Sequence, residues 1–152
     1  MHISFKELIT KHKLDCNNKQ CCIKSKVVKE NGKRLEIISN EDFTKIKIDD
    51  CLIKSQVREK CDFGILRNSN NDFYFVELKG TEIQKAFNQI VATIDYFESN
   101  LISISKGNRL GFIISSSVPK SGVGANILKQ AFAKKYGRVL EIKNRELIYN
   151  PK

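Results

Sequence analysis

Three residues in the middle of the chain could do chemistry together: Asp62, Glu77 and Lys79. The segment before Glu77 is apolar, so charged groups at its end need a physical reason. Mg²⁺ in proteins takes one or two carboxylates and fills its remaining positions with water and substrate phosphate. A lysine beside such a cation can hold the attacking water or stabilise charge on the phosphate. These residue types therefore favour metal-assisted hydrolysis of a phosphodiester.

A predicted hairpin positions these groups. Its strands are Cys61–Arg67 and Phe73–Lys79, and a four-residue polar loop joins them. If the residues flanking the loop pair with each other, Asp62 lies directly opposite Glu77. Opposed side chains of an antiparallel pair have Cβ atoms about 4.5–5.5 Å apart, and like charges at that position repel each other. A divalent cation would turn the repulsion into a binding site.

The spacing of these residues resembles a known signature. Asp62, followed after fourteen residues by Glu77-Leu78-Lys79, is similar to the D…ExK pattern of the PD-(D/E)xK nuclease superfamily. That superfamily includes many restriction endonucleases and Holliday-junction resolvases, and the chain is most similar to its small stand-alone bacterial members. The resemblance covers about residues 51–116, in the order strand, strand, strand, helix and strand. Upstream the chain departs from the pattern, because Cys61 stands where proline is common.

The resemblance implies both a fold and an activity. The expected fold is a restriction-endonuclease-like α/β (α+β) domain over residues 1–152, with a mixed central β-sheet flanked by helices. The expected activity is that of an endo- or exodeoxyribonuclease that depends on Mg²⁺ or Mn²⁺, with DNA as its partner. Asp62, Glu77 and the carbonyl of Leu78 would bind the metal, and Lys79 would orient the attacking water.

Two further positions are matched through the same resemblance. Some members carry a glutamine on the helix after the motif, and Gln89 stands at that position, with Gln84 as a second option. Gln89 would position Lys79 or touch the substrate. Members often add a glutamate from the first helix, for which Glu7 is the available match.

The charge of the chain points to a polyanionic partner. The net charge is +10, and residues 100–152 hold 10 basic and 2 acidic groups, whereas residues 61–99 hold 3 basic and 6 acidic groups. Such a basic balance favours nucleic acid; good solubility alone is the plainer interpretation. The candidate phosphate contacts are Lys120, Lys129, Lys134, Lys135 and Arg138.

The five cysteines suggest no chemistry of their own. Their number is odd and the first residues, Met1 to Leu14, do not form a secretory signal, so we expect free, mostly buried thiols in a cytoplasmic protein. A zinc site built on Cys16, Cys21 and Cys22 is the alternative. There is no apolar run of 18 residues or more, so a membrane span is not expected.

The remaining elements follow from periodicity and turn residues. A short helix is predicted over His2–Lys13, and helices after Thr81 and over Ser121–Tyr136, the last one ending at Gly137. The predicted strands outside the motif are Ile23–Val28, Leu35–Ser39, Lys45–Ile48, Leu52–Val57, Arg109–Ser116, Val139–Ile142 and Leu147–Tyr149. Hairpin turns are expected at Asn31-Gly32 and between the last two strands.

Two other function classes stay open. The chain could be a nucleic-acid-binding module of the same fold that is catalytically silent or acts only with a partner subunit, or a cysteine-based regulatory protein. Metal-dependent cleavage distinguishes the first alternative and metal content the second. A homodimer also stays open.

Overall fold

The structure, a computed structural model, describes residues 3–4, 21–49, 51, 59–78, 82–99, 102–116 and 123–151. The strands are β1 (Ile3–Ser4), β2 (Cys22–Lys24), β3 (Val27–Glu30), β4 (Lys33–Ile37), β5 (Phe43–Lys47), β6 (Phe63–Arg67), β7 (Phe73–Glu77), β8 (Ile102–Ser103), β9 (Arg109–Ser115), β10 (Val139–Asn144) and β11 (Glu146–Tyr149). The helices are α2 (Ile83–Ser99) and α3 (Val123–Ala131), with a 3-10 turn at Lys106–Asn108 and a π-helical turn at Phe132–Tyr136. No helix within these ranges is long and apolar enough to span a membrane.

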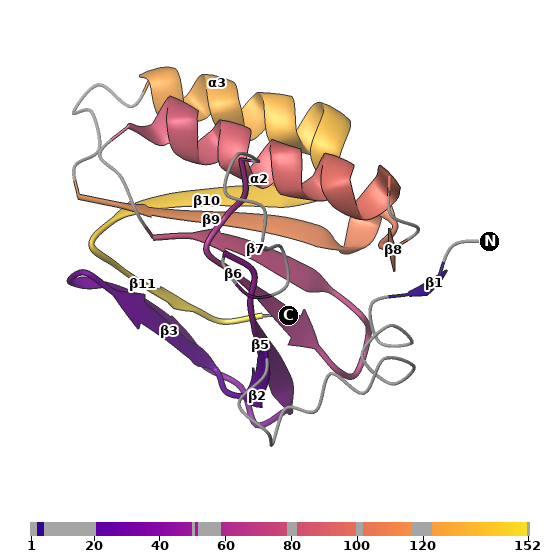
Figure 1. Ribbon diagram of the computed structural model, residues 1–152. Coiled ribbons are helices and arrows are strands. Elements are labelled where there is room, and N and C mark those ends of the chain that lie inside the picture. Colours follow the sequence, from indigo (N-terminus) through magenta and orange to yellow (C-terminus); the bar gives the residue numbers. More distant parts are fainter. Residues whose placement is uncertain are drawn as a thin grey trace.

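The elements stack in three layers (Figure 1). The middle layer is a mixed six-stranded sheet in the order β10-β9-β7-β6-β5-β2, and a second sheet has the order β11-β4-β3. Helices α2 and α3 cover one face of the large sheet, and the small sheet packs against the other. The prediction of an α/β chain with a mixed β-sheet is confirmed. Strands, rather than helices, cover the second face.

The connections of the large sheet bring several strand ends to one edge. Strands β5, β6 and β7 form an antiparallel meander. Strand β9 is parallel to β7 and β10 is parallel to β9, with α2 and α3 as the crossovers that parallel neighbours need. We call the side where β5, β7, β9 and β10 end and β6 begins the exit edge, and the opposite side the entry edge.

Strand β7 lies at the centre of the molecule, and all five of its residues are buried. Phe73 and Phe75 pack among the helices, whereas Tyr74 and Val76 pack toward the small sheet. The segment before Glu77, which is apolar in the sequence, is thus a buried strand. By the same alternation Glu77 belongs to the helix-covered face.

Two predictions about strands are wrong. Ile23–Val28 is not one strand, because β2 and β3 belong to different sheets and Ser25 makes a turn between them, accepting a hydrogen bond from the Val27 N–H at 3.1 Å. The predicted terminal hairpin does not form either, since β10 pairs with β9 and β11 with β4. Arg145, with φ of 66°, stands between these last two strands where the chain passes from one sheet to the other.

Other predictions hold or fall outside the described residues. The hairpin turn at Asn31-Gly32 is confirmed, with φ of 53° and 78° as a type I′ turn requires. Ile3–Ser4 is a strand paired with β8, not part of the predicted helix His2–Lys13, whose other residues are not described. The predicted strand Leu52–Val57 also lies outside the described residues, and the strand that pairs with β6 is β5.

Helix α3 and its π-helical turn end at Gly137, as predicted. The residue is not the left-handed cap that commonly ends a helix, because its φ is −163°. It must be glycine for lack of space: a Cβ there would lie 2.6 Å from the Arg109 carbonyl oxygen and would overlap the ring of Phe132.

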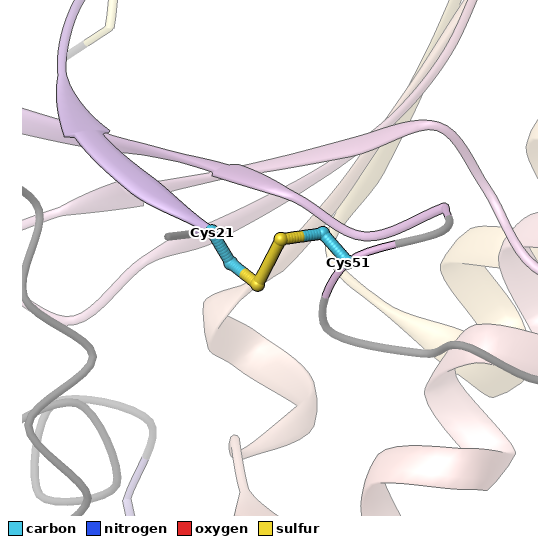
Figure 2. Close-up of a disulfide and its surroundings, with 2 residues drawn as sticks. All are labelled: Cys21 and Cys51. Atoms are coloured by element: carbon cyan, nitrogen blue, oxygen red, sulfur yellow. A yellow bond between two sulfur atoms is a disulfide. The ribbon is translucent and has the colours of Figure 1, made fainter. Parts of the chain in front are cut away.

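The prediction that all the cysteines are free thiols is wrong for two of them and holds for two others. Cys21 and Cys51 form a disulfide, with Cα atoms 5.5 Å apart (Figure 2). The bond joins the residue before β2 to the turn after β5, which the pairing of these two strands brings together. Cys22 and Cys61 are buried free thiols, and Cys16 lies outside the described residues.

Candidate active site

The β6–β7 hairpin has the register that the sequence predicts. Phe63 pairs with Val76, and one step outward Asp62 lies opposite Glu77. No bulge interrupts the pairing of the two strands. Across the loop, the Arg67 N–H donates to the Asp72 carbonyl at 2.9 Å. The two carboxyl groups are therefore neighbours at the exit edge of the large sheet.

Backbone amides hold both carboxyl groups in place. The Asp62 N–H donates to Oε1 of Glu77 at 3.0 Å, and the Leu78 N–H donates to Oδ2 of Asp62 at 2.8 Å. Each carboxylate is thus fixed by the backbone next to the other one. Such support from a rigid hairpin gives the pair a defined geometry before anything binds.

Burial gives this pair its electrostatic character. Asp62 is 4% exposed and Glu77 is 1% exposed. Opposed like charges destabilise a sheet, and a buried charge is costly unless it is compensated. Two carboxylates are the donor set that suits Mg²⁺ or Mn²⁺, so the residues present fit such an ion. Among the described residues no group of three or more His, Cys, Asp or Glu side chains gathers, so further ligands would come from elsewhere, such as the Leu78 carbonyl.

Two charged residues beside the pair were not singled out from the sequence. The N–H groups of Ile48 and Asp49 donate to the Asp62 carbonyl at 3.0 and 3.2 Å. The Lys60 amine lies 3.5 Å from Oδ1 of Asp49, and Lys60 is buried. The register of β5 against β6 would have placed Asp49 next to Asp62, had β5 been recognised as the partner of β6.

Helix α2 is tied to the segment that leads into Asp62. Nε2 of Gln89 donates to the Lys60 carbonyl at 3.4 Å. Oγ1 of Thr93 accepts from the Cys61 N–H at 2.8 Å and donates to the Gln89 carbonyl at 2.8 Å. Gln89 therefore supports the backbone that leads into Asp62, and its role toward Lys79 stays a prediction because Lys79 lies outside the described residues. Thr93 was also missed: a polar side chain on the apolar face of a predicted helix was the available signal.

The Cys61 thiol is unsuited to nucleophilic chemistry. Burial raises its pKa well above the usual range, and the negative charges of Glu77 and Asp62 add to this effect. The thiol donates a hydrogen bond to the Phe63 carbonyl, with the sulfur 3.6 Å from the oxygen. It therefore stays protonated and serves packing.

The other residues predicted for the site differ in what the structure shows of them. Lys79, Glu7 and Lys120 lie outside the described residues. Leu78 is described: its side chain is fully buried, and its N–H donates to the Asp62 carboxylate. Gln84 donates to Asn88 on the same helix.

The predicted phosphate contacts that are described lie toward the entry edge. They are Lys129, Lys134, Lys135 and Arg138. Lys129 is in the last turn of α3, the next two are in the π-helical turn, and Arg138 precedes β10. Arg138 is also engaged, because its Nη2 donates to Oδ2 of the buried Asp72 at 2.9 Å. The structure thus does not bring these residues together with the carboxylate pair.

Comparison with known proteins adds no family to this description. No protein-family model, no curated protein and no solved structure matches the chain.

Proposed function

We propose that the chain is a metal-dependent nuclease of the PD-(D/E)xK type that hydrolyses DNA phosphodiester bonds. The observation that carries the proposal is the buried, directly opposed pair Asp62 and Glu77, held by backbone amides at the exit edge. Like charges buried side by side weaken a fold, so a functional reason for them is favoured.

The surrounding topology supports the proposal. A strand, a strand that begins after Asp62, a strand that ends at Glu77, a helix and a parallel strand follow one another, as the resemblance to the superfamily implies. We therefore propose a restriction-endonuclease-like core from β5 to β9, with the first strand placed earlier in the chain than the sequence suggests.

The residues divide into roles within this proposal. Asp62, Glu77 and the Leu78 carbonyl hold Mg²⁺ or Mn²⁺. A bound ion of this kind lowers the pKa of a coordinated water and offsets charge on the phosphate. Lys79, two residues after Glu77 in the sequence, orients the attacking water. Gln89 is a positioning residue, because it holds the backbone that leads into Asp62.

The test is a cleavage assay on DNA and RNA duplexes, junctions and single strands with Mg²⁺, Mn²⁺ or EDTA. Asp62→Asn and Glu77→Gln should each lower the rate of cleavage about a thousandfold, because a bound metal ion stabilises the transition state by several kcal/mol. Asp95→Asn, an exposed carboxylate on α2, is the matched control and should cleave normally.

Two outcomes contradict the proposal. Cleavage that continues in excess EDTA would exclude a metal-dependent reaction. Full cleavage by either variant would exclude a catalytic role for Asp62 and Glu77. Metal-independent binding of DNA without any cleavage would favour the alternative, a nucleic-acid-binding module without turnover.

A further inference from the structure

The disulfide lies at the exit edge, close to the carboxylate pair. Cys21 precedes β2, and its carbonyl accepts a hydrogen bond from the Lys47 N–H at 2.7 Å. Lys47 pairs with Phe63, the residue after Asp62. Cys21 is therefore two strands away from Phe63, a separation of about 10 Å. Figure 2 shows how the bond crosses from Cys21 to Cys51, in the turn that follows β5.

The turn after β5 also holds the backbone of Asp62. We call its described residues, Ile48, Asp49 and Cys51, the β5 turn. The first two residues each donate an N–H to the Asp62 carbonyl, at 3.0 and 3.2 Å. The carboxylate of Asp49 lies 3.5 Å from the Lys60 amine, so a side-chain contact joins the same two segments. The β5 turn therefore helps to fix one of the two carboxylate residues of the proposed metal site.

The disulfide anchors the far end of this turn. Among the described residues, Cys51 otherwise makes one hydrogen bond, from its N–H to the Ile48 carbonyl, and its length of 3.4 Å is long for such a bond. Asp62 and Glu77 repel each other at the same time. An open disulfide would release the β5 turn, and the repulsion would then favour a wider separation of the two carboxylates. A metal site depends on the placement of its ligands to about 0.5 Å, so such a change lowers metal affinity.

The residues of this disulfide are partly exposed. Cys21 and Cys51 are half-buried, whereas the free thiols Cys22 and Cys61 are buried. Thiol–disulfide exchange requires that a thiolate approach one of the two sulfur atoms. A small dithiol can therefore approach this bond in the folded protein.

We infer that the Cys21–Cys51 disulfide is a redox switch of the metal site, an inference that rests on the proposed function. In the oxidised protein the bond holds the β5 turn, and the turn holds Asp62 for the metal ion. A dithiol reductant opens the bond: its first thiolate attacks one sulfur, and its second thiolate releases the protein thiol from the mixed disulfide. Two electrons and two protons pass to Cys21 and Cys51, the reductant becomes a disulfide, and the metal affinity falls.

The first experiment compares Mn²⁺ binding by the oxidised and the reduced protein, followed by the EPR signal of the free ion. The reductant is removed under an oxygen-free atmosphere before the titration. Reduction should weaken Mn²⁺ binding about tenfold or more, the usual effect of losing a group that orients a metal ligand. Reoxidation with a small disulfide compound, which is itself reduced to thiols, should restore the affinity. Cys21→Ser/Cys51→Ser should bind as the reduced wild type and ignore the reductant, whereas Cys22→Ser should respond as wild type does.

Loss of the disulfide also destabilises the fold, so the titration includes a control of lowered stability. Asp72→Asn at the entry edge removes the acceptor charge that Arg138 contacts, while the disulfide and the β5 turn stay intact. This variant should bind Mn²⁺ as the oxidised wild type does. A loss of affinity in Asp72→Asn equal to that of the reduced protein would overturn the inference, because general destabilisation would then explain the effect.

Amide hydrogen exchange tests the link between the disulfide and the β5 turn without any metal. Reduction should speed the exchange of the Ile48 and Asp49 amides, because local opening of the turn exposes them to water. Both amides should exchange faster in the reduced wild type than in oxidised Asp72→Asn. Equal exchange of the two amides in these two proteins would overturn the inference, as would exchange that ignores the reductant.

The Mn²⁺ titration also separates this inference from the proposed function. If the oxidised wild type binds no Mn²⁺, the proposed function fails and the switch fails with it. If the oxidised and the reduced protein bind Mn²⁺ with equal affinity, the switch alone fails.

Discussion

At the entry edge of the large sheet buried or half-buried carboxylates meet cations, whereas at the exit edge two buried carboxylates meet each other. Asp72, 1% exposed, accepts from Nη2 of Arg138 at 2.9 Å and from Nδ2 of Asn108 at 2.7 Å. Arg67 and Glu41 form a further ion pair at this edge. Asp62 and Glu77 at the other edge lie directly opposed.

Under the proposed function, this difference separates a structural edge from a functional one. An acid compensated by arginine and amide donors, like Asp72, stabilises the strand that it begins. An opposed pair of acids weakens the hairpin that carries it unless a cation joins it. Ion pairs of Asp72 and Glu41 thus lie at the entry edge, whereas the exit edge carries the opposed acids Asp62 and Glu77 beside the ion pair of Lys60 and Asp49.

The disulfide should contribute most to stability. Cys21–Cys51 closes a loop of about 30 residues, and its loss should lower the free energy of unfolding by about 3–4 kcal/mol. Denaturant unfolding of the wild type with and without a thiol reductant measures this, and the double variant Cys21→Ser/Cys51→Ser should match the reduced protein. Cys22→Ser, which removes a free thiol, should respond to the reductant as wild type does. An unfolding curve that ignores the reductant would contradict the bond.

At the entry edge, Asp72→Asn should lower the free energy of unfolding by about 2–3 kcal/mol. The substitution removes the charge that Arg138 and Asn108 contact and leaves these donors poorly matched. Metal-dependent cleavage per folded molecule should not change. A cleavage defect in folded Asp72→Asn would break the division between the two edges.

At the exit edge, the opposite sign is expected. Glu77→Gln keeps an oxygen that can accept the Asp62 N–H and removes the repulsion between the two acids. In metal-free buffer the free energy of unfolding should rise by about 0.2–1 kcal/mol, the usual size of a cross-strand charge effect. Thermal unfolding in EDTA measures it, and a clear loss of stability would show that the pair is structural.

The smallest effect concerns the pH dependence of the entry edge. Hydrogen bonds from Arg67 and then Ser69 lower the pKa of Glu41 from 4.5 to about 2. The stabilisation of the folded state by the ion pair of Glu41 and Arg67 is therefore fully present above about pH 4.5, and it is lost as the pH falls through 2. Carbon NMR of the carboxyl group should give a midpoint near 2 in the wild type and a higher one in Ser69→Ala. A wild-type midpoint near 4.5 would contradict the ion pair.

Local rules were sufficient for the parts of the fold that depend on neighbouring residues. The β6–β7 register followed from pairing the residues that flank the short loop, and the hairpin turn followed from the dipeptide Asn31-Gly32, which favours a left-handed backbone. The helix after Thr81 followed from a repeat of apolar residues. These features are decided within some twenty residues, where periodicity and turn chemistry carry the information.

Features that depend on distant partners could not be predicted in the same way. The sequence does not show that β11 pairs with β4 instead of β10, or that β5 pairs with β6. Because Asp49 reaches the site through that pairing, it was missed. The Cys21–Cys51 bond likewise depends on the β2–β5 pairing, and an odd number of cysteines does not exclude it.

Metal binding by the exit edge tests the central claim most directly. Titration of the protein with Mn²⁺, followed by the loss of the free-ion EPR signal, measures it without any substrate. Wild type and Asp72→Asn should bind one ion at the same affinity, while Asp62→Asn and Glu77→Gln should lose that binding. Unchanged Mn²⁺ affinity in Glu77→Gln, or no binding by the wild type, would contradict the assignment of this pair as a metal centre.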